Sequence, residues 1–153
     1  MTGANPILPC AIDDLIPHGP SMRMVDTLVS MEEAEAKVHF TVRPGSVFVD
    51  SDGLLDETAY IEMIAQAFAA THGYYLTPAQ RAEHKGLLIG VKDLVIDGQA
   101  RVGDKLVITV RRVARFGDFG IVDGEVHLDN GRRLAIGQIK VWRPGEDAGK
   151  DTM

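Results

Sequence analysis

The stretch Leu54 to Gly73 constrains the fold of this chain more than any other. From Ala59 to Ala70 it is apolar on every side of a helical wheel except at Glu62 and Gln66. A helix that is apolar all round belongs inside a folded domain. Acidic residues before it suit the positive end of the helix dipole, and Gly73 is expected to cap its other end in the left-handed conformation. The sequence therefore predicts one buried central helix.

One polar line runs along this helix, because Thr58, Glu62 and Gln66 are spaced four residues apart. A buried carboxylate has to be paired, hydrogen-bonded or protonated, since an isolated buried charge is strongly unfavourable. Glu62 is therefore the first candidate for chemistry. The alternative is that the line faces solvent or a subunit interface, where Glu62 would be an ordinary solvated residue.

The composition suits a single domain, with 153 residues of which 45% are hydrophobic. We expect one domain over residues 1–153, with its core at about residues 12–143 and a flexible tail at 144–153. A net charge of −6 argues against nucleic acid and anionic membrane as partners. The single cysteine excludes an internal disulfide framework, and the N-terminus lacks the pattern of a secretory signal, so we expect a cytoplasmic protein.

Alternating apolar residues predict strands on both sides of the central helix. Two are expected before it, one from Ser21 onward and one over Ala36 to Val42, while Thr77-Pro78 should begin a short helix after it. The four strands expected next are Gly86 to Ile96, Lys105 to Phe116, Phe119 to Leu128 and Arg133 to Arg143. We predict an α+β fold, in which an antiparallel meander wraps one side of the helix and another subunit meets the other side.

A histidine stands in a proline-rich turn before the first strand, in Pro17-His18-Gly19-Pro20. The sequence PHGPSMRMVD, the segment IEMIAQA around Glu62 and Gln66, and the turn VGDKL at residues 102–106 carry a family resemblance. By these motifs the chain resembles the hot-dog-fold 3-hydroxyacyl-ACP dehydratases of the FabZ type, especially their ApeP-like relatives. The resemblance implies a hot-dog fold, in which an antiparallel sheet wraps around one long central hydrophobic helix.

The same resemblance implies catalytic roles for two side chains. His18 would take the C2 proton of a 3-hydroxyacyl thioester, and Glu62 would act as the acid at the departing hydroxyl. An imidazole that titrates near neutral pH and a carboxyl group on an apolar helix suit these roles. Gln66 is expected to hydrogen-bond beside them, and the alternative is a polar residue that is satisfied by backbone carbonyls. Ser21-Met22 replaces the Pro-Phe of the FabZ pattern, so Met22 is expected in a substrate tunnel of different shape.

The thioester oxygen of such a substrate needs positive potential, which free backbone N–H groups at the start of the central helix could supply. The dehydratase family has a Met-Pro-Gly-like segment there. This chain has Leu54-Leu55-Asp56-Glu57 instead. We expect Leu55 and Asp56 to contact the substrate, while the oxyanion donor itself stays open.

The implied activity is elimination of water from 3-hydroxyacyl thioesters on acyl carrier protein (ACP) or CoA, in fatty-acid, polyketide or aryl polyene type biosynthesis. No cofactor is implied. We expect no metal, because the sequence has no HxH or HExxH pattern. A homodimer is expected, with the two catalytic residues approaching from different subunits, or a heterodimer with a related hot-dog subunit.

Two alternatives to the dehydratase stay open. One is a hot-dog acyl thioesterase, in which a carboxylate on the central helix activates water. The other is a non-catalytic acyl-binding partner of a heteromeric dehydratase. Arg111, Arg112 and Arg115 would form either a basic patch that docks an acidic carrier protein or the solvated face of a strand.

Overall fold

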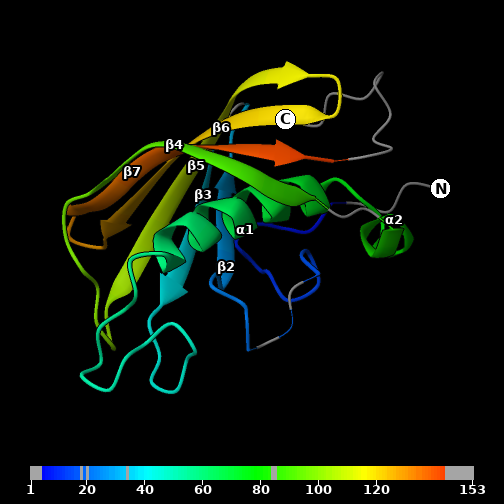
Figure 1. Ribbon diagram of the computed structural model, residues 1–153. Helices are drawn as coiled ribbons and strands as arrows, with labels where there is room; N and C mark the ends of the chain where they lie inside the picture. The colour runs from blue at the N-terminus through cyan, green and yellow to red at the C-terminus, as the bar shows by residue number, and fades with distance from the viewer. Residues whose placement is uncertain (1–4, 18, 20, 34, 84–85, 144–153) are drawn as a thin grey trace.

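The computed structural model describes residues 5–17, 19, 21–33, 35–83 and 86–143 (Figure 1). The tail expected at residues 144–153 lies outside them. Within the described residues, the chain forms two helices and seven strands. In chain order these are β1 (Cys10–Ala11), β2 (Thr27–Met31), β3 (Glu35–Thr41), α1 (Ala59–Tyr74), α2 (Pro78–Glu83), β4 (Leu87–Ile96), β5 (Lys105–Phe116), β6 (Phe119–Leu128) and β7 (Arg133–Trp142).

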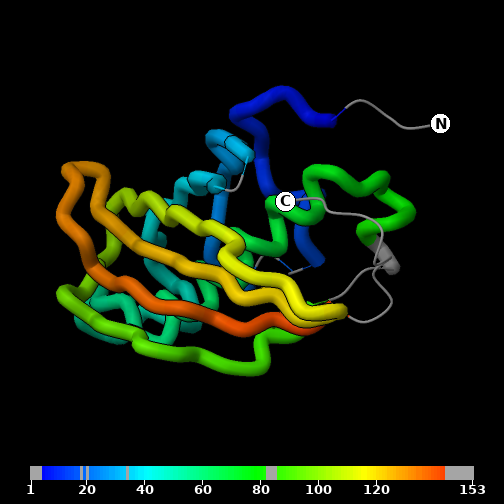
Figure 2. Tube along the Cα trace, turned by 90° about the horizontal axis from the view of Figure 1, so that it is seen from above, coloured from blue at the N-terminus to red at the C-terminus, as the bar shows by residue number. Residues whose placement is uncertain are grey.

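All described strands belong to one antiparallel sheet in the order β1-β2-β3-β5-β6-β7-β4. The predicted meander is confirmed for β5, β6 and β7. It is wrong for β4, which pairs with β7 at the far edge of the sheet (Figure 2). The segment between β4 and β5 is tied to the start of α1, where Leu55 N–H donates to the carbonyl of Ala100 at 2.9 Å. The chain therefore crosses the sheet before β5 pairs with β3.

Helix α1 lies across one face of this sheet (Figure 1). The helix packs tightly against Gly124 of β6, where a Cβ would lie 2.4 Å from the side chain of Ile64. Side chains of the strands that face α1 are buried, and include Val38, Ile108, Val122 and Ile139. Because each fully buried aliphatic side chain contributes about 1.5–3 kcal/mol, this helix-to-sheet contact is the main source of stability.

The N-terminal segment covers part of the other side of α1. A Cβ at Gly73 would lie 2.0 Å from the carbonyl oxygen of Leu15, so the two backbones are in direct contact. The prediction that Gly73 is a left-handed cap is wrong, because the helix continues to Tyr74 and ends at Tyr75 in the right-handed conformation. Glycine is needed there for close approach. The N-terminal segment therefore packs directly on the end of α1.

The first long strand begins at Thr27 rather than at Ser21 as predicted. The segment before it takes its hydrogen bonds elsewhere, since Met24 N–H donates to the Gln66 side chain instead of to a strand. The other expected strands are confirmed with ends that differ by one residue at most. The short helix is confirmed as well, and the side chains and N–H groups of Thr77 and Gln80 cap it reciprocally.

Candidate active site

A cavity of 260 Å³ lies between α1 and the ends of β4 and β7. Helix α1 contributes Glu62, Ala65 and Ala69 to its wall. The remaining wall is mainly apolar, with Leu15, Pro17, Leu87 and Leu88, but it also includes His72, Arg81 and Arg143. Glu62 is therefore a carboxyl group at the side of an apolar space large enough for part of an acyl chain.

Gln66 joins Glu62 to the N-terminal segment. Its side chain is fully buried, and Nε2 donates to the carbonyl of Met22 at 2.8 Å and to Glu62 Oε1 at 3.2 Å. Its Oε1 accepts the N–H of Met24 at 2.6 Å. The backbone partners fix the orientation of the amide, because Met22 offers a carbonyl and Met24 offers an N–H. The polar line expected on α1 thus links Glu62 and Gln66 directly.

His18, the expected base, lies outside the described residues. Its neighbour Pro17 lines the cavity that Glu62 also lines, within one chain. The segment that carries position 18 is attached to α1 on both sides, at Leu15 by backbone contact with Gly73 and at Met22 by the hydrogen bond from Gln66. The backbone on each side of position 18 is therefore held next to the Glu62 cavity.

The other expected substrate contacts do not lie in this cavity. Leu55 is fully buried in the core, and Asp56 is exposed, where it accepts hydrogen bonds from the N–H and the hydroxyl of Thr58. These two hydrogen bonds lower the pKa of the Asp56 carboxyl below its ordinary value, and the bond from the Thr58 hydroxyl has the larger effect. Met22 reaches the site through its carbonyl, and its residue surface is 44% exposed.

The backbone N–H groups expected to bind the thioester oxygen are engaged within the chain. Leu55 donates to Ala100, and Asp56 donates to the carbonyl of Phe48 at 2.7 Å. The N–H of Thr58 is taken by the Asp56 side chain. The start of α1 therefore serves to anchor the segments around it, and the oxyanion donor that the sequence left open is not found among these three groups.

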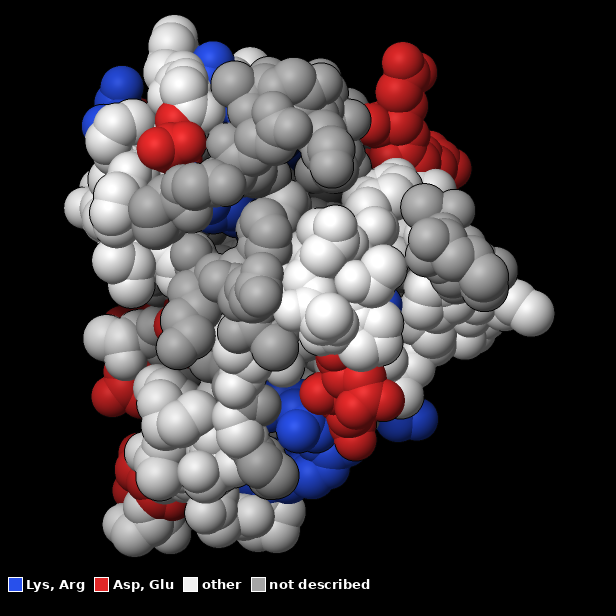
Figure 3. Space-filling model, turned by 90° about the vertical axis from the view of Figure 1, so that its right-hand side faces the viewer, with Lys and Arg blue, Asp and Glu red and all other residues white. Residues whose placement is uncertain are grey.

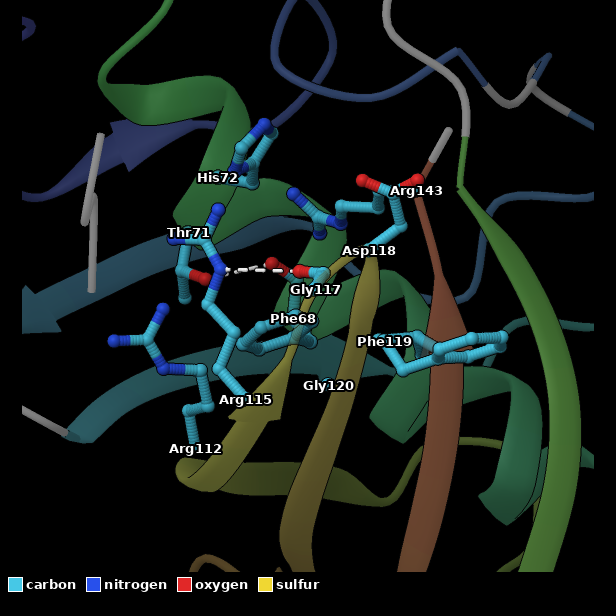
Figure 4. A pocket seen from close by; sticks show the side chains of 11 residues that line it. Phe68, Thr71, His72, Arg112, Arg115, Gly117, Asp118, Phe119, Gly120 and Arg143 are labelled. Atoms are coloured by element: carbon cyan, nitrogen blue, oxygen red, sulfur yellow. Dashed lines mark hydrogen bonds between the residues drawn. The ribbon is translucent and has the colours of Figure 1, made fainter. Parts of the chain in front are cut away.

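A second, smaller cavity of 30 Å³ adjoins the first near the end of α1 (Figure 4). It is lined by His72, Arg112, Arg115 and Arg143 among others, and His72 and Arg143 line both cavities. The sequence gives no signal that His72 and Arg143 line the same cavities, because the two residues lie far apart in the chain.

Two further features are absent from the described residues. No group of three or more His, Cys, Asp and Glu side chains in these ranges is arranged to hold a metal ion. Neither described helix has the length and apolar character needed to cross a membrane.

A model of the ApeP dehydratase family matches residues 10–151, and so covers nearly the whole chain. The chain belongs to the ApeP-like dehydratase family. This confirms the resemblance inferred from the motifs, and it supports a dehydratase-like function. No significant match is found among curated protein sequences.

Solved structures confirm the hot-dog fold of this ApeP-like chain. The ApeI:P dehydratase heterocomplex from Xenorhabdus doucetiae matches with a TM-score of 0.79 and 24% identity, over 92% of this chain and 94% of that one. The PaaI protein from the phenylacetic acid degradation operon of E. coli matches with a TM-score of 0.58 and 18% identity, over 76% and 81% of the two chains. A hypothetical thioesterase with coenzyme A from Streptococcus pneumoniae matches with a TM-score of 0.61 and 12% identity, over 79% of this chain and 87% of that one.

Proposed function

We propose that this chain eliminates water from 3-hydroxyacyl thioesters without a cofactor, and that residues 1–153 act as one hot-dog domain. The observation that carries the proposal is the placement of Glu62, whose carboxyl group lines an apolar cavity and accepts a hydrogen bond from the buried Gln66. Pro17, which precedes His18 in the chain, lines the same cavity and supports this assignment. Family membership supports the reaction class.

In the proposed reaction, His18 removes the C2 proton while Glu62 donates a proton to the C3 hydroxyl. The C2–H and C3–O bonds break, a C2=C3 double bond forms, and water leaves. Glu62, whose Oε1 accepts the hydrogen bond from Gln66, is the proposed proton donor. The catalytic groups return to their starting state when the proton on His18 passes back to Glu62.

We further propose that β4 pairs with a second hot-dog chain, either another copy or a related subunit. β4 is an edge strand with exposed apolar side chains, among them Leu87 at 54%, Ile89 at 46% and Val91 at 42% exposure. A long apolar edge strand of this kind is a ready template for strand pairing. Since Leu87 and Leu88 also line the cavity, a partner strand there would close it from solvent.

Two observations favour alternative functions, and the turnover experiment described below separates them from dehydration. The similarity to a thioesterase with coenzyme A favours hydrolysis, with Glu62 activating water. The similarity to a heteromeric dehydratase complex favours a chain that binds the acyl group and supports catalysis by its partner. Both alternatives use the same cavity, so only the product and the dependence on a partner distinguish them.

The test is turnover of a panel of 3-hydroxyacyl thioesters on CoA and on ACP, read by mass spectrometry, with the chain alone and mixed with a related hot-dog dehydratase subunit. We expect loss of water, and at least about a hundredfold slower turnover in both His18→Ala and Glu62→Gln. Glu57→Gln, an exposed glutamate just before α1, is the matched control and should keep full activity. Release of free acid would instead establish a thioesterase.

A different pattern would identify the partner subunit. In that case the wild-type chain binds acyl-ACP without converting it, and the two site variants leave the turnover of the mixed complex unchanged. Native mass spectrometry of the chain alone and of the mixture checks the proposed pairing. Val91→Lys, on the exposed part of β4, should reduce pairing of either kind because it places a charge at the strand-to-strand contact.

A further inference from the structure

We propose that Arg112, Arg115 and Arg143, called here the arginine cluster, bind a phosphate ester on the carrier of the thioester substrate. This proposal rests on the proposed function, since it assumes a pantetheine thioester in the Glu62 cavity. Pantetheine carries such a phosphate both in CoA and on acyl carrier protein. The cluster would hold the phosphate while the acyl group lies at Glu62.

A β-bulge in β5 brings two of the three arginines together. Residues three apart on a regular strand point to opposite faces, so Arg112 and Arg115 would normally diverge. The pairing of β5 with β6 shifts by one residue between Arg112 and Ala114, and both arginines then line the small cavity at the end of α1. A bulge that redirects a side chain in this way is commonly found beside functional sites. Arg111, by contrast, faces the polar outer surface of the sheet.

Arg143 approaches the same point from the end of β7. The guanidinium carbon of Arg143 lies 4.8 Å from the centre of the Phe68 ring. The backbone N–H of Arg143 donates to the carbonyl of Asp118 at 2.9 Å. Figure 4 shows Arg112 and Arg115 reaching from β5, and Arg143 from beyond β7, toward the side of α1 that bears His72. Packing and backbone contacts thus fix where these positive charges lie.

The charge balance of this cavity favours an anion. Among its described lining residues are three arginines and one carboxylate, Asp118. All three arginines are half-buried, which makes an anionic ligand more favourable there than on an open surface. Arginine also presents a planar fork of donors that matches phosphate oxygens. On the face in Figure 3, acidic and basic side chains form separate groups, so charge of one sign is concentrated locally on this molecule.

The arginine cluster is connected to the Glu62 cavity. The two cavities share Phe68, His72, Val141 and Arg143 as lining residues. From Glu62 to His72 the helix advances about 15 Å, at a rise of about 1.5 Å per residue. An extended pantetheine arm covers a comparable span between its phosphate and its sulfur. A phosphate at the arginine cluster would therefore place the thioester close to Glu62.

The first experiment measures binding without turnover. Isothermal titration of the full chain with 4′-phosphopantetheine and with pantetheine isolates the contribution of the phosphate. We expect the phosphate to tighten binding about tenfold, as is typical of hydrogen bonds to charged groups, and Arg115→Gln or Arg112→Gln to remove most of this gain. Arg111→Gln, on the same strand but on the outer surface, is the matched control and should retain it.

Equal binding of the two ligands by the wild-type chain would overturn the proposal, as would a phosphate effect that survives in both variants. Circular dichroism of each variant checks that it is folded, and Arg112→Gln and Arg115→Gln serve as independent substitutions. This contrast does not require catalysis. It therefore gives an answer even if no dehydration is detected and the proposed function fails.

The second experiment identifies the source of the phosphate. KM is compared for the same 3-hydroxyacyl group on CoA, on ACP and on N-acetylcysteamine, which has no phosphate. Arg115→Gln should raise KM about tenfold for CoA or for the carrier protein, with kcat unchanged, and should leave the N-acetylcysteamine thioester unaffected. The carrier whose thioester shows the raised KM supplies the phosphate that the arginine cluster binds. A rise of equal size for all three substrates would overturn a phosphate site.

Discussion

The two halves of α1 are held by different kinds of contact. In the first half, buried polar side chains make specific hydrogen bonds. Gln66 donates to the carbonyl of Met22 and accepts from the N–H of Met24, and the Tyr60 hydroxyl donates to the segment before β5. In the second half, the contact with the N-terminal segment is steric, because Gly73 permits the backbone of Leu15 to touch the helix. The segment with His18 therefore has one hydrogen-bonded attachment and one attachment by shape.

This difference has a consequence for the proposed site. A hydrogen bond fixes both distance and direction, whereas a close contact at a glycine fixes only how near two backbones lie. Glu62 stands in the hydrogen-bonded half, where Gln66 sets the position of its carboxyl group. Substitution of Gln66 should therefore affect catalysis and stability together, whereas substitution of Gly73 should affect mainly stability.

The largest effect is expected for Gln66→Leu. It leaves the N–H of Met24 and the carbonyl of Met22 without their partner, at about 1–3 kcal/mol for each unsatisfied group. We expect the free energy of unfolding to fall by about 4 kcal/mol in urea denaturation, and dehydratase turnover to fall with it. Gln66→Glu is the matched variant, because it keeps an acceptor for Met24 but loses both donors, and it should lie between wild type and Gln66→Leu. Unchanged stability in Gln66→Leu would contradict the described network.

Gly73→Ala should have the next largest effect, and the direction is informative. Helix propensity alone predicts a gain of about 1 kcal/mol for alanine in a helix interior. The new Cβ would meet Leu15 at 2.0 Å, so the N-terminal segment has to move away, and we expect a net loss of about 2 kcal/mol in thermal or urea unfolding. Gly19→Ala, in the same segment and with open space around it, is the control. A stabilised Gly73→Ala protein would show that the contact is not maintained.

The sequence predicted those parts of the fold that depend on local periodicity. The apolar pattern located α1 and the last strands, because neighbouring residues alone determine helical and strand alternation. It could not place β4 beside β7, nor Leu15 beside Gly73, since these contacts join distant segments. Gly73 was assigned a cap because glycine after a helix usually adopts the left-handed conformation. The close approach that requires glycine there is visible only in three dimensions.

The candidate site divides in the same way. Glu62 and Gln66 were found from their spacing on one helix, and their hydrogen bond follows from that spacing. The arginine cluster was found only in part, since the bulge that brings Arg112 beside Arg115 arises from strand pairing. Arg143 was missed, because its position depends on a stacking contact with the distant Phe68.

Tyr60→Phe tests the other hydrogen bond of the first half. The hydroxyl donates to the carbonyl of Gly98 at 3.0 Å and accepts the N–H of Ala100 at 2.9 Å, while the ring stays buried. Removing the hydroxyl should cost about 1–2 kcal/mol in urea unfolding, because Ala100 N–H loses its acceptor and no large cavity forms. Turnover should stay close to wild type, since Tyr60 does not line the cavity. A loss of activity without a loss of stability would show that the β4–β5 segment acts on the site.

The smallest effect is expected for Asp56→Asn, and it depends on pH. The Thr58 hydroxyl and, to a smaller extent, the Thr58 N–H donate hydrogen bonds that lower the pKa of Asp56 from an ordinary value of 3.8. A lowered carboxyl pKa adds stability that is present above the unfolded pKa and is lost as the pH falls through the folded pKa. The wild-type chain should therefore have a slightly higher Tm than Asp56→Asn at pH 7, and the difference should disappear toward pH 2. Since asparagine keeps an acceptor for Thr58, a difference that persists at low pH would assign the effect to shape rather than charge. The contribution of Asp56 to stability would then be steric, like the contact at Gly73, and not electrostatic.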